Sequence, residues 1–220
     1  MIADLHIHSR FSRATSQKMN IDEITRFARI KGLNLVGTGD FTHPKWLKEL
    51  REELIEISDT NLYGTAKHPD SPVRYMITAE VSTIFTFEGS VKKIHHVVLT
   101  PSLETAIQIN ERLTRYGDLG VDGRPMLDMT APHLVEEVMQ VSDENVVIPS
   151  HAWTPWFSIF GAFSGFDRVE DCYQDMTRHI PALETGLSSD PPMNWRLSAL
   201  DKFALVSNSD SHSSWPWRIG

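Results

Sequence analysis

The chain contains 220 residues, of which 40% are hydrophobic, and it carries a formal net charge of −8. This length suits one globular domain over residues 1–220. Because the sequence has no apolar run long enough to span a bilayer and does not start like a leader peptide, we expect a cytoplasmic protein without membrane segments. The excess of acidic residues is not typical of a nucleic-acid-binding surface, although bound divalent cations would offset it locally. Cys172 is the single cysteine, which excludes an internal disulfide and a thiolate-rich zinc site.

The N-terminal part begins with a short strand and then alternates helices with strands. In the opening stretch "MIADLHIHSRFS", His6 and His8 are two residues apart, so both point to one face of the strand. A helix follows, because Asn20 is a suitable N-cap, apolar residues recur at helical spacing, and Gly32 is a typical stop. The next predicted elements are a buried strand at 33–40 and an amphipathic helix at 43–58.

The rest of the chain continues this alternation. Strands are predicted at 74–83, 144–151, 179–186 and 203–212, a hairpin at 82–101, and helices at 103–116, 131–142 and 191–201. Strand–helix alternation repeated about seven times favours an α/β fold with a closed, parallel or mostly parallel barrel over a sandwich.

Histidines and carboxylates recur at or near the C-terminal ends of the predicted strands. They are His6, His8, Asp40, Glu80, His95, His151, Glu184, Asp210 and His212. In α/β barrels this end is where active sites assemble. Imidazole and carboxylate together suit zinc, manganese or iron, and a bridging glutamate can hold two ions about 3.5–4 Å apart. A single histidine pair would be unremarkable, but the whole set indicates a metal cluster.

These motifs resemble a known superfamily over nearly the whole chain. The stretches "DLHIHSRFS", "GTGD", "AEVS", "IHHVVL", "PSHAW" and "NSDSH" are similar to the PHP (polymerase and histidinol phosphatase) phosphoesterases. The similarity is greatest to endonuclease Q and to PHP domains fused to superfamily-one helicases, through "VGTGDFTHPKW", "PSHAWTPWFS", "ETGLSSDPPMNWRLSALD" and "SDSHSSWPWRIG". The resemblance implies a distorted (β/α)7, TIM-like barrel, the PHP fold, with two or three divalent metal ions (Zn, Mn or Fe, with Mg also open).

By motif position, the resemblance also implies the ligands. One ion would be held by His6, His8, Glu80 and Asp210, and a second by Glu80, His95 and His151. Strand alternation sends His95 and His96 to opposite faces, so only one of them can be a ligand, and the motif position in the family favours His95. The third site departs from the family pattern, since Arg13 stands where a ligand is expected and Asp40 replaces a histidine. Asp40 and His212 remain candidate ligands there, and Arg13 a candidate contact for a substrate phosphate.

Residues around these ligands are candidates for substrate binding and catalysis. We assign catalytic roles to Asp210, His212, Asp40 and Arg13, and substrate contacts to Arg10, Arg13, His43, Trp153 and Trp156. The tryptophans could form a wall for a displaced base or pack as ordinary core residues, whereas packing is favoured for Phe157 and Phe160. His43 is equally part of a helix start. Glu184 either supports a ligand or the nucleophilic water, or is a buried charged partner of Arg196.

The leading functional hypothesis is a metal-dependent DNA endonuclease that acts at deaminated or abasic sites. Two cations bridged by a carboxylate acidify a water and neutralise charge on phosphoryl oxygens, which is the chemistry of phosphoester hydrolysis. One alternative is a phosphatase acting on a small phosphomonoester or nucleotide. A second alternative is a non-catalytic PHP module of a larger DNA repair or helicase protein. Because the sequence stops soon after His212, we expect a C-terminal truncation and additional C-terminal domains.

Overall fold

The computed structural model describes residues 1–215 and 218–220, so Pro216 and Trp217 of the last motif quoted above lie outside the described residues. Over these ranges the centre is an eight-stranded mixed sheet, and a pair of parallel strands follows it in the chain. The sheet contains β1 (Ala3–Asp4), β2 (Leu35–Gly37), β3 (Leu54–Ile57), β4 (Leu62–Thr65), β5 (Arg74–Phe87), β6 (Ser90–Thr100), β7 (Met126–Leu127) and β8 (Val146–Pro149). The pair is β9 (Ala182–Glu184) and β10 (Ala204–Val206).

Strand pairing is parallel at one end of the sheet and antiparallel around a long hairpin. β1 pairs in parallel with β2, and β2 with β5. β5 and β6 pair in antiparallel because only two residues, 88 and 89, connect them, and β8 pairs in antiparallel with β6. The fold is therefore mixed α/β with a central sheet. The expected closed, mostly parallel barrel is not found among the strands of the described ranges.

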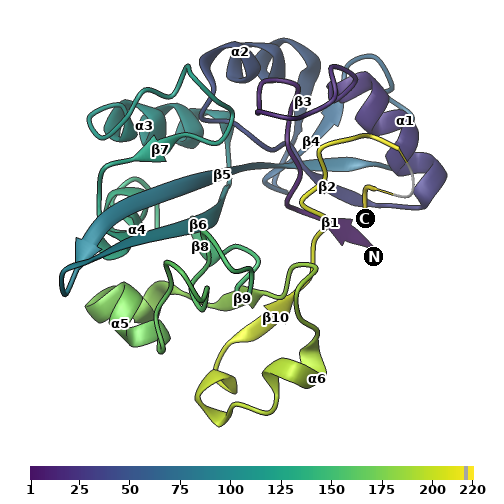
Figure 1. Ribbon diagram of the computed structural model, residues 1–220. Helices are drawn as coiled ribbons and strands as arrows, with labels where there is room; N and C mark the ends of the chain where they lie inside the picture. The colour runs from purple at the N-terminus through teal and green to yellow at the C-terminus, as the bar shows by residue number, and fades with distance from the viewer. Residues whose placement is uncertain (216–217) are drawn as a thin grey trace.

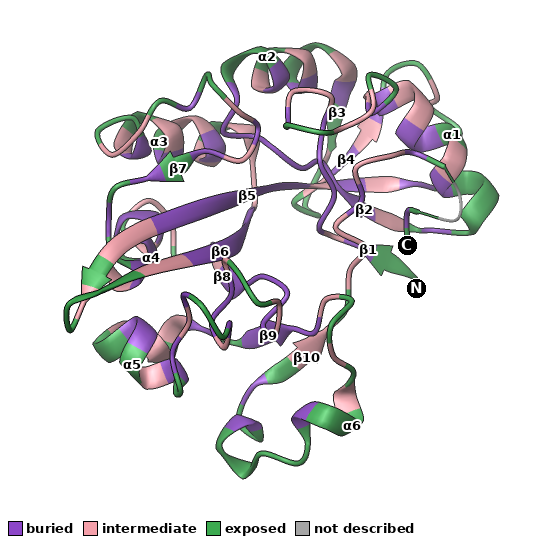
Figure 2. Ribbon diagram, in the orientation of Figure 1, coloured by how far each residue is buried: buried purple, intermediate pink, exposed green. Residues whose placement is uncertain are grey.

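Helices lie on both sides of β5, and the smaller pair of strands lies on one of these sides. In Figure 1, α1 (Ile21–Lys31), α2 (Pro44–Glu53) and α3 (Leu103–Leu113) lie above β5, whereas α5 (Val169–Tyr173), α6 (Pro191–Asn194), β9 and β10 lie below it. The remaining helix is α4 (Ala131–Met139), and 3₁₀ turns occur at Gln174–His179 and Ser198–Leu200. Figure 2 shows that β5 and β6 are buried along much of their length, as strands at the centre of a core must be.

Helix α1 forms as its capping residues predict. The side chain of Asn20 accepts a hydrogen bond from the backbone N–H of Glu23, and Gly32 ends the helix in the left-handed conformation with a φ of 86°. The apolar stripe of α1, which includes Ile21 and Ile24, is buried against the sheet. The predicted N-terminal and C-terminal signals of this helix are confirmed.

The helix predicted at 43–58 is shorter than expected. It ends at Glu53, and residues 54–57 form β3, which pairs in antiparallel with β4. The sequence "LIEI" contains two β-branched residues and alternates around a polar one, so it fits a strand once a partner is available. The helix predicted at 191–201 is likewise reduced to α6 and a 3₁₀ turn. The short elements β4, β7 and α5 were not predicted.

The two ends of the chain lie side by side, as Figure 1 shows. Ile7 forms a parallel bridge with Ser211, and the carboxylate of Asp4 accepts hydrogen bonds from the backbone N–H groups of Ser209 and Gly220. This pairing brings the segment after β1 next to the segment after β10. Within the described ranges, no helix has the length and apolar character needed to cross a membrane.

Candidate metal centre

Five side chains from distant parts of the chain meet around one buried carboxylate, that of Glu80. Their donor atoms form two groups, and within each group they lie within 4.8 Å of one another. The first group is His6, His8, Glu80 and Asp210, and the second is Glu80, His95 and His151. All of these side chains are buried except Asp210, which is partly exposed. The structure thus brings together the two predicted ligand sets, with Glu80 shared between them.

The first group combines two imidazoles with two carboxylates. The Nε2 atom of His8 lies 2.9 Å from Oδ1 of Asp210 and 3.4 Å from Oε2 of Glu80. The Nε2 atom of His6 lies 3.5 Å from Oε1 of Glu80 and 3.5 Å from Oδ1 of Asp210. Two nitrogen and two oxygen donors therefore converge on a single point.

The second group is built on the other side of Glu80. Oε1 of Glu80 lies 3.0 Å from Nδ1 of His95 and 3.2 Å from Nε2 of His151. The two imidazole nitrogens are themselves 3.2 Å apart. Because Glu80 offers oxygens to both groups, it is placed as a bridging carboxylate.

A second layer of carboxylates orients the histidines of the first group. Nδ1 of His6 lies 3.0 Å from both oxygens of Glu184, and Nδ1 of His8 lies 3.0 Å from Oδ1 of Asp40. With Nδ1–H donating to these carboxylates, the Nε2 atom of each ring is left directed at Glu80. Such carboxylate–histidine pairs fix the tautomer and the orientation of histidines that bind metals.

Glu184 supports both groups, which answers the question that its sequence position left open. Besides His6, it accepts hydrogen bonds from the backbone N–H of His151 at 2.8 Å and from the side chain of Asn208 at 2.8 Å. Its partners are these groups rather than Arg196. The interpretation of Glu184 as a support for a ligand therefore agrees with the geometry.

Burial and charge set the protonation of the first group. Burial acts to lower the pKa of both His6 and His8. At His6 the carboxylates of Glu184 and Glu80 outweigh burial, and at His8 the carboxylate of Asp40 does so. Both pKa values are therefore held well above the usual value for histidine. Burial would raise the pKa of Glu80, yet the neighbouring His95 and His6 hold it well below its ordinary value. Glu80 is therefore ionised at neutral pH.

The neighbouring histidines of β6 face opposite ways, as strand alternation predicts. His95 points into the donor cluster, and its burial lowers its pKa to about 4. His96 points into the core, where its Nε2 lies 2.9 Å from Oγ1 of Thr83 and its Nδ1 lies 2.8 Å from the hydroxyl of Tyr173. Burial lowers the pKa of His96 to about 3, so it is a neutral core residue.

Three residues at the site have backbones in the left-handed region. The φ angles are 50° for Asp40, 29° for His151 and 49° for Asp210. Residues other than glycine rarely adopt this conformation, and it clusters at functional sites where the surrounding structure imposes it. Next to His151, a Cβ added to Gly186 would lie 2.5 Å from the His151 Cβ, so only glycine allows the chain to approach this closely.

The donor set fits a divalent metal. Nε2 of His6 is buried and lacks a hydrogen-bond partner among the described residues, although it faces two carboxylates. A buried polar atom without a partner is costly, and a metal ion would satisfy it. Imidazole and carboxylate donors suit zinc, manganese or iron. We conclude that these side chains suit divalent metal binding.

The residues predicted for a third ion do not join the two donor groups. Asp40 lies behind His8, and its Oδ2 accepts hydrogen bonds from the backbone and side chain of Ser9, both at 2.6 Å. Its carboxylate is thus occupied, which favours positioning of His8 over direct ligation. His212 directs Nδ1 at the carbonyl of Asp210 at 2.9 Å, and its ring lies 4.5 Å from that of His8. His212 therefore stays beside the first group, and its role as a ligand stays a prediction.

The predicted phosphate contacts differ in their surroundings. Arg13 is 84% exposed and lines a pocket next to His95. Arg10 is engaged in an ion pair with Glu49 at 2.6 Å, so it is less available to a substrate than expected. His43 is a buried residue at the start of α2, and its ring stacks on that of Phe11 at 4.6 Å.

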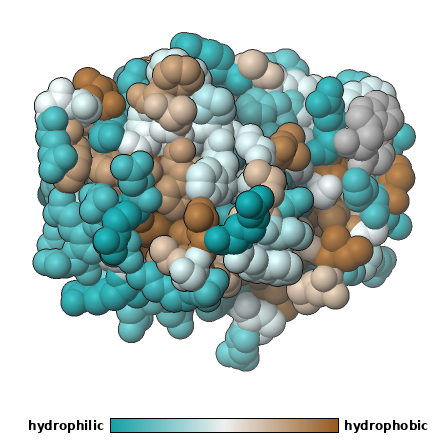
Figure 3. Space-filling model, turned by 60° about the horizontal axis from the view of Figure 1, so that its bottom comes forward, coloured by the Kyte–Doolittle hydropathy of each residue, from teal (hydrophilic) through white to brown (hydrophobic). Residues whose placement is uncertain are grey.

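The aromatic residues after His151 divide between packing and exposure. Trp153 packs against Phe160 and donates from Nε1 to Oδ1 of Asn194 at 2.9 Å, which is a structural role. Trp156 is 54% exposed and stacks on Phe163. Phe157, which was expected to pack, instead lies 4.6 Å from the His95 ring and lines the pocket. Apolar side chains are also visible among polar ones on the face turned forward in Figure 3.

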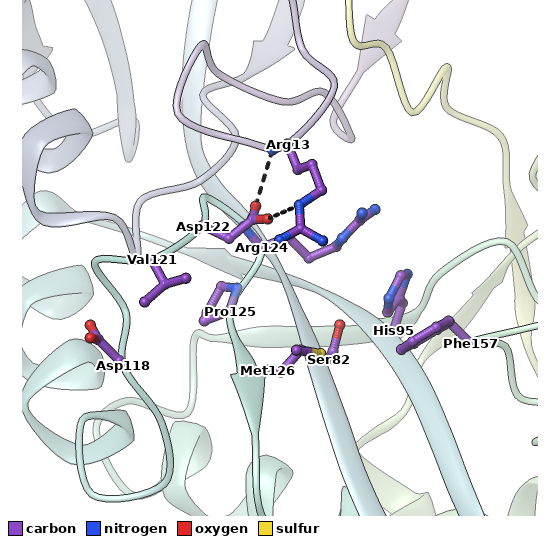
Figure 4. Close-up of a pocket in the computed structure, with 10 residues that line it drawn as sticks. All are labelled: Arg13, Ser82, His95, Asp118, Val121, Asp122, Arg124, Pro125, Met126 and Phe157. Atoms are coloured by element: carbon purple, nitrogen blue, oxygen red, sulfur yellow. Dashed lines mark hydrogen bonds and ion pairs between the residues drawn. The ribbon is translucent and has the colours of Figure 1, made fainter.

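One charged residue at the site was missed by the sequence analysis. Nη1 of Arg124 lies 3.2 Å from Oε2 of Glu80, and Figure 4 shows its side chain reaching across the pocket toward the side where His95 lies. Arg124 belongs to a loop without periodicity or a recognisable motif. In the structure this loop lies directly before β7, which pairs with β5, and neither fact could be read from the sequence.

Two solved structures resemble the whole of this chain. The lesion-specific endonuclease PfuEndoQ from Pyrococcus furiosus is 33% identical with a TM-score of 0.84, over 99% of this chain and 50% of that one. A structure of endonuclease Q in complex with a 27-mer duplex substrate, with an abasic lesion at the active site, is 34% identical with the same TM-score and the same shares. These comparisons confirm the predicted resemblance to endonuclease Q. PsfC from Pseudomonas syringae, 13% identical with a TM-score of 0.59, shares the fold alone.

Two curated proteins are also similar in sequence. An uncharacterised protein of Methanocaldococcus jannaschii is 32% identical over 169 residues, which are 76% of this chain and 18% of that protein. The uncharacterised protein YqxK of Bacillus subtilis is 27% identical over 96% of this chain and 54% of its own length. No family model matches the sequence. The chain spans about half the length of the two endonuclease Q structures, and its match covers less than a fifth of the Methanocaldococcus jannaschii protein.

Proposed function

We propose that this chain, which resembles endonuclease Q in sequence and fold, is the phosphoesterase domain of a metal-dependent DNA endonuclease that acts at deaminated or abasic sites. The observation that carries the proposal is the double donor group around Glu80. The resemblance to a structure in complex with a duplex containing an abasic lesion supports DNA as the substrate.

The proposed ions number two, one in each donor group, with a third only if His212 and Asp40 contribute to it. Zinc, manganese or iron suits the donors, and magnesium remains open. Divalent ions in such a site supply an acidified water and compensate the charge that develops on phosphoryl oxygens. We also keep as proposals a closed (β/α)7 barrel, one domain over residues 1–220 and a cytoplasmic location.

The chain's own residues would prepare the site for this chemistry. Glu184 and Asp40 hold the rings of His6 and His8 in one orientation, so the donor atoms need little rearrangement. Asp210 is the one partly exposed carboxylate of the two donor groups, and in this proposal it accepts a proton from the attacking water. Arg124 reaches the same region with a positive charge that suits a phosphate.

A cleavage assay tests this proposal. The protein is incubated with Mn²⁺ and end-labelled duplexes that contain one deoxyuridine, one deoxyinosine or one abasic site, beside an unmodified duplex and a generic phosphomonoester. We expect a nick at the lesion that is lost in Asp210→Ala and retained in Asp143→Ala, which alters an exposed aspartate of a distant loop.

Other outcomes point to the alternatives. Turnover of the phosphomonoester with every duplex intact would contradict the endonuclease proposal and favour the phosphatase. Metal binding without turnover of any substrate would favour a non-catalytic module.

A further inference from the structure

A pocket of about 420 Å³ opens beside the donor cluster and combines positive charge with apolar walls. Its lining includes both Arg13 and Arg124. The apolar part comes from Val121, Pro125, Met126 and Phe157. His95, a member of the second donor group, lines the same pocket. A ligand in this pocket would therefore touch the site at which phosphoester hydrolysis is proposed.

Arg124 is tied to the cluster but keeps donors for a ligand. Its ion pair with Glu80 engages Nη1, and the side chain is 27% exposed. A guanidinium carries five N–H donors in a planar fork, which matches the oxygens of a phosphate. Arg124 is thus held next to the reacting position while part of its fork faces the pocket.

Asp122 joins the two segments that carry the arginines. Its Oδ1 accepts hydrogen bonds from the backbone N–H of Arg13 at 3.3 Å and from that of Arg124 at 3.1 Å. Its Oδ2 lies 4.0 Å from Nε of Arg13, as the dashed lines in Figure 4 indicate. One carboxylate therefore sets the distance between the N-terminal loop and the loop at 117–125.

The next residue, Gly123, packs this loop against the support of His8. A Cβ at Gly123 would lie 2.4 Å from Oδ2 of Asp40 and 2.4 Å from Oγ of Ser12, so only glycine fits. The backbone N–H of Gly123 also donates to the carbonyl of Phe11 at 3.1 Å. Contacts on both sides of the loop thus fix Arg124 relative to the cluster.

The two aspartates that line the pocket do not occupy its inner end, which is the end next to His95. Asp122 is occupied by Arg13, and Asp118 accepts from the backbone N–H of Gly120 at 2.8 Å within its own loop. In Figure 4, Asp118 lies at the opposite end of the pocket from His95. The inner end is therefore the place where an anion would meet Arg124.

We propose that this pocket binds a phosphodiester group of the DNA strand, next to the bond that is cleaved, through Arg124 and Arg13, with Asp122 as a positioning residue. The proposal rests on the proposed function and names a substrate contact within it. The apolar wall suits the deoxyribose that follows such a phosphate. Arg13, being exposed, can close over the strand from the solvent side.

Binding to a phosphorothioate-protected duplex with an abasic-site analogue tests the proposal. Fluorescence anisotropy is measured at several salt concentrations for the wild type, Arg124→Gln, Arg124→Lys and Asp122→Asn, with Arg26→Gln on the exposed face of α1 as the control. We expect Arg124→Gln to weaken binding by about 10- to 100-fold and to reduce the slope of log K against log salt by about one. Arg124→Lys should keep the slope while losing part of the affinity, and Asp122→Asn should weaken binding in the same direction.

A neutral methylphosphonate at the linkage next to the lesion makes the test independent of folding and metal content, because two DNAs are compared on the same protein. This linkage should weaken binding to the wild type clearly more than it weakens binding to Arg124→Gln, in which only Arg13 still meets the phosphate. Additive losses, or an unchanged slope in Arg124→Gln, would overturn the proposal even if the wild type nicks DNA. An effect of Arg124→Gln confined to the KM for a phosphomonoester would overturn DNA as the ligand. Absence of nicking by the wild type would contradict the proposed function instead.

Discussion

The two halves of the donor cluster share Glu80 but are supported differently. Behind His6 and His8 stand the carboxylates of Glu184 and Asp40. Behind the rings of His95 and His151 the contacts are neutral: the His95 ring lies against Phe157, and Nδ1 of His151 lies 3.0 Å from Oγ1 of Thr154. Glu184 reaches this half only through the backbone N–H of His151. The pKa values follow this difference, because the acid-backed histidines are raised whereas burial lowers the pKa of His95 to about 4.

This comparison shows how one bridging residue can serve two unequal sites. A carboxylate behind a histidine increases the basicity of the ring and fixes its orientation, so we expect the half with His6 and His8 to bind its metal more tightly. The half with His95 and His151 borders the pocket and is expected to exchange its metal more readily.

The largest effect is expected from a change in Glu80, the residue that both halves share. Glu80→Gln withdraws the shared charge from both halves, so metal content should fall at both sites and lesion cleavage should drop by more than about a hundredfold. Elemental analysis of the purified protein and initial cleavage rates measure this. Full metal content in the variant would show that Glu80 is not the bridge.

The next effect separates the two halves. Asp40→Asn and Glu184→Gln keep the shape of the side chains but remove the charge behind His8 and His6. We expect each to weaken the tighter metal site by about 10- to 100-fold, as measured by chelator competition. Asp40→Asn should leave the weaker site within a fewfold of its original affinity, whereas Glu184→Gln should also affect that site, because Glu184 accepts a hydrogen bond from the backbone N–H of His151. An equal loss at both sites in Asp40→Asn would show that its support is not confined to one half.

A smaller loss of metal affinity is expected from a change beside His151, in the second donor group. Thr154→Val removes the hydroxyl next to His151 and should weaken the second site by about two- to tenfold, which is the contribution of one neutral hydrogen bond. The same competition titration reports it. A loss as large as that in Glu184→Gln would remove the distinction between charged and neutral support.

The smallest effect concerns His96, the neighbour that faces the core. Its pKa is about 3 when folded and about 6.5 when unfolded, so the unfolded chain takes up a proton first as the pH falls. The contribution of neutral His96 to stability is complete above pH ~6.5 and is lost as the pH falls toward 3, by up to ~1.4 kcal/mol per pH unit. Urea unfolding of the metal-free protein between pH 7 and 5 should show a shallower pH dependence for His96→Asn than for the wild type. Equal slopes would show that His96 is not buried in its neutral form.

The donor cluster was predictable from the sequence because its residues belong to a recognisable order of motifs at strand ends. Strand alternation showed that only one of His95 and His96 can face the site, the motif position favoured His95, and the structure places the two as expected. The supporting role of Glu184 was one of two open alternatives, because a sequence does not show which cation a buried carboxylate faces.

Other features depend on contacts that a sequence does not display. Arg124 and Asp122 lie in an irregular loop, and their roles follow from where β5 and the N-terminal loop place Glu80 and Arg13. The residues of β3 have a pattern that also fits the end of α2, and only pairing with β4 decides between them. The mixed pairing of the sheet likewise follows from the tight turn between β5 and β6.

The most direct test of the central claim is an anomalous diffraction measurement on crystals grown with Mn²⁺. The account predicts two peaks on either side of the Glu80 carboxylate, one within reach of His6, His8 and Asp210 and the other within reach of His95 and His151. The second peak should be the weaker one after brief soaking in chelator. Absence of any peak at Glu80, or a metal bound elsewhere in the chain, would contradict the assignment of this cluster as the metal centre.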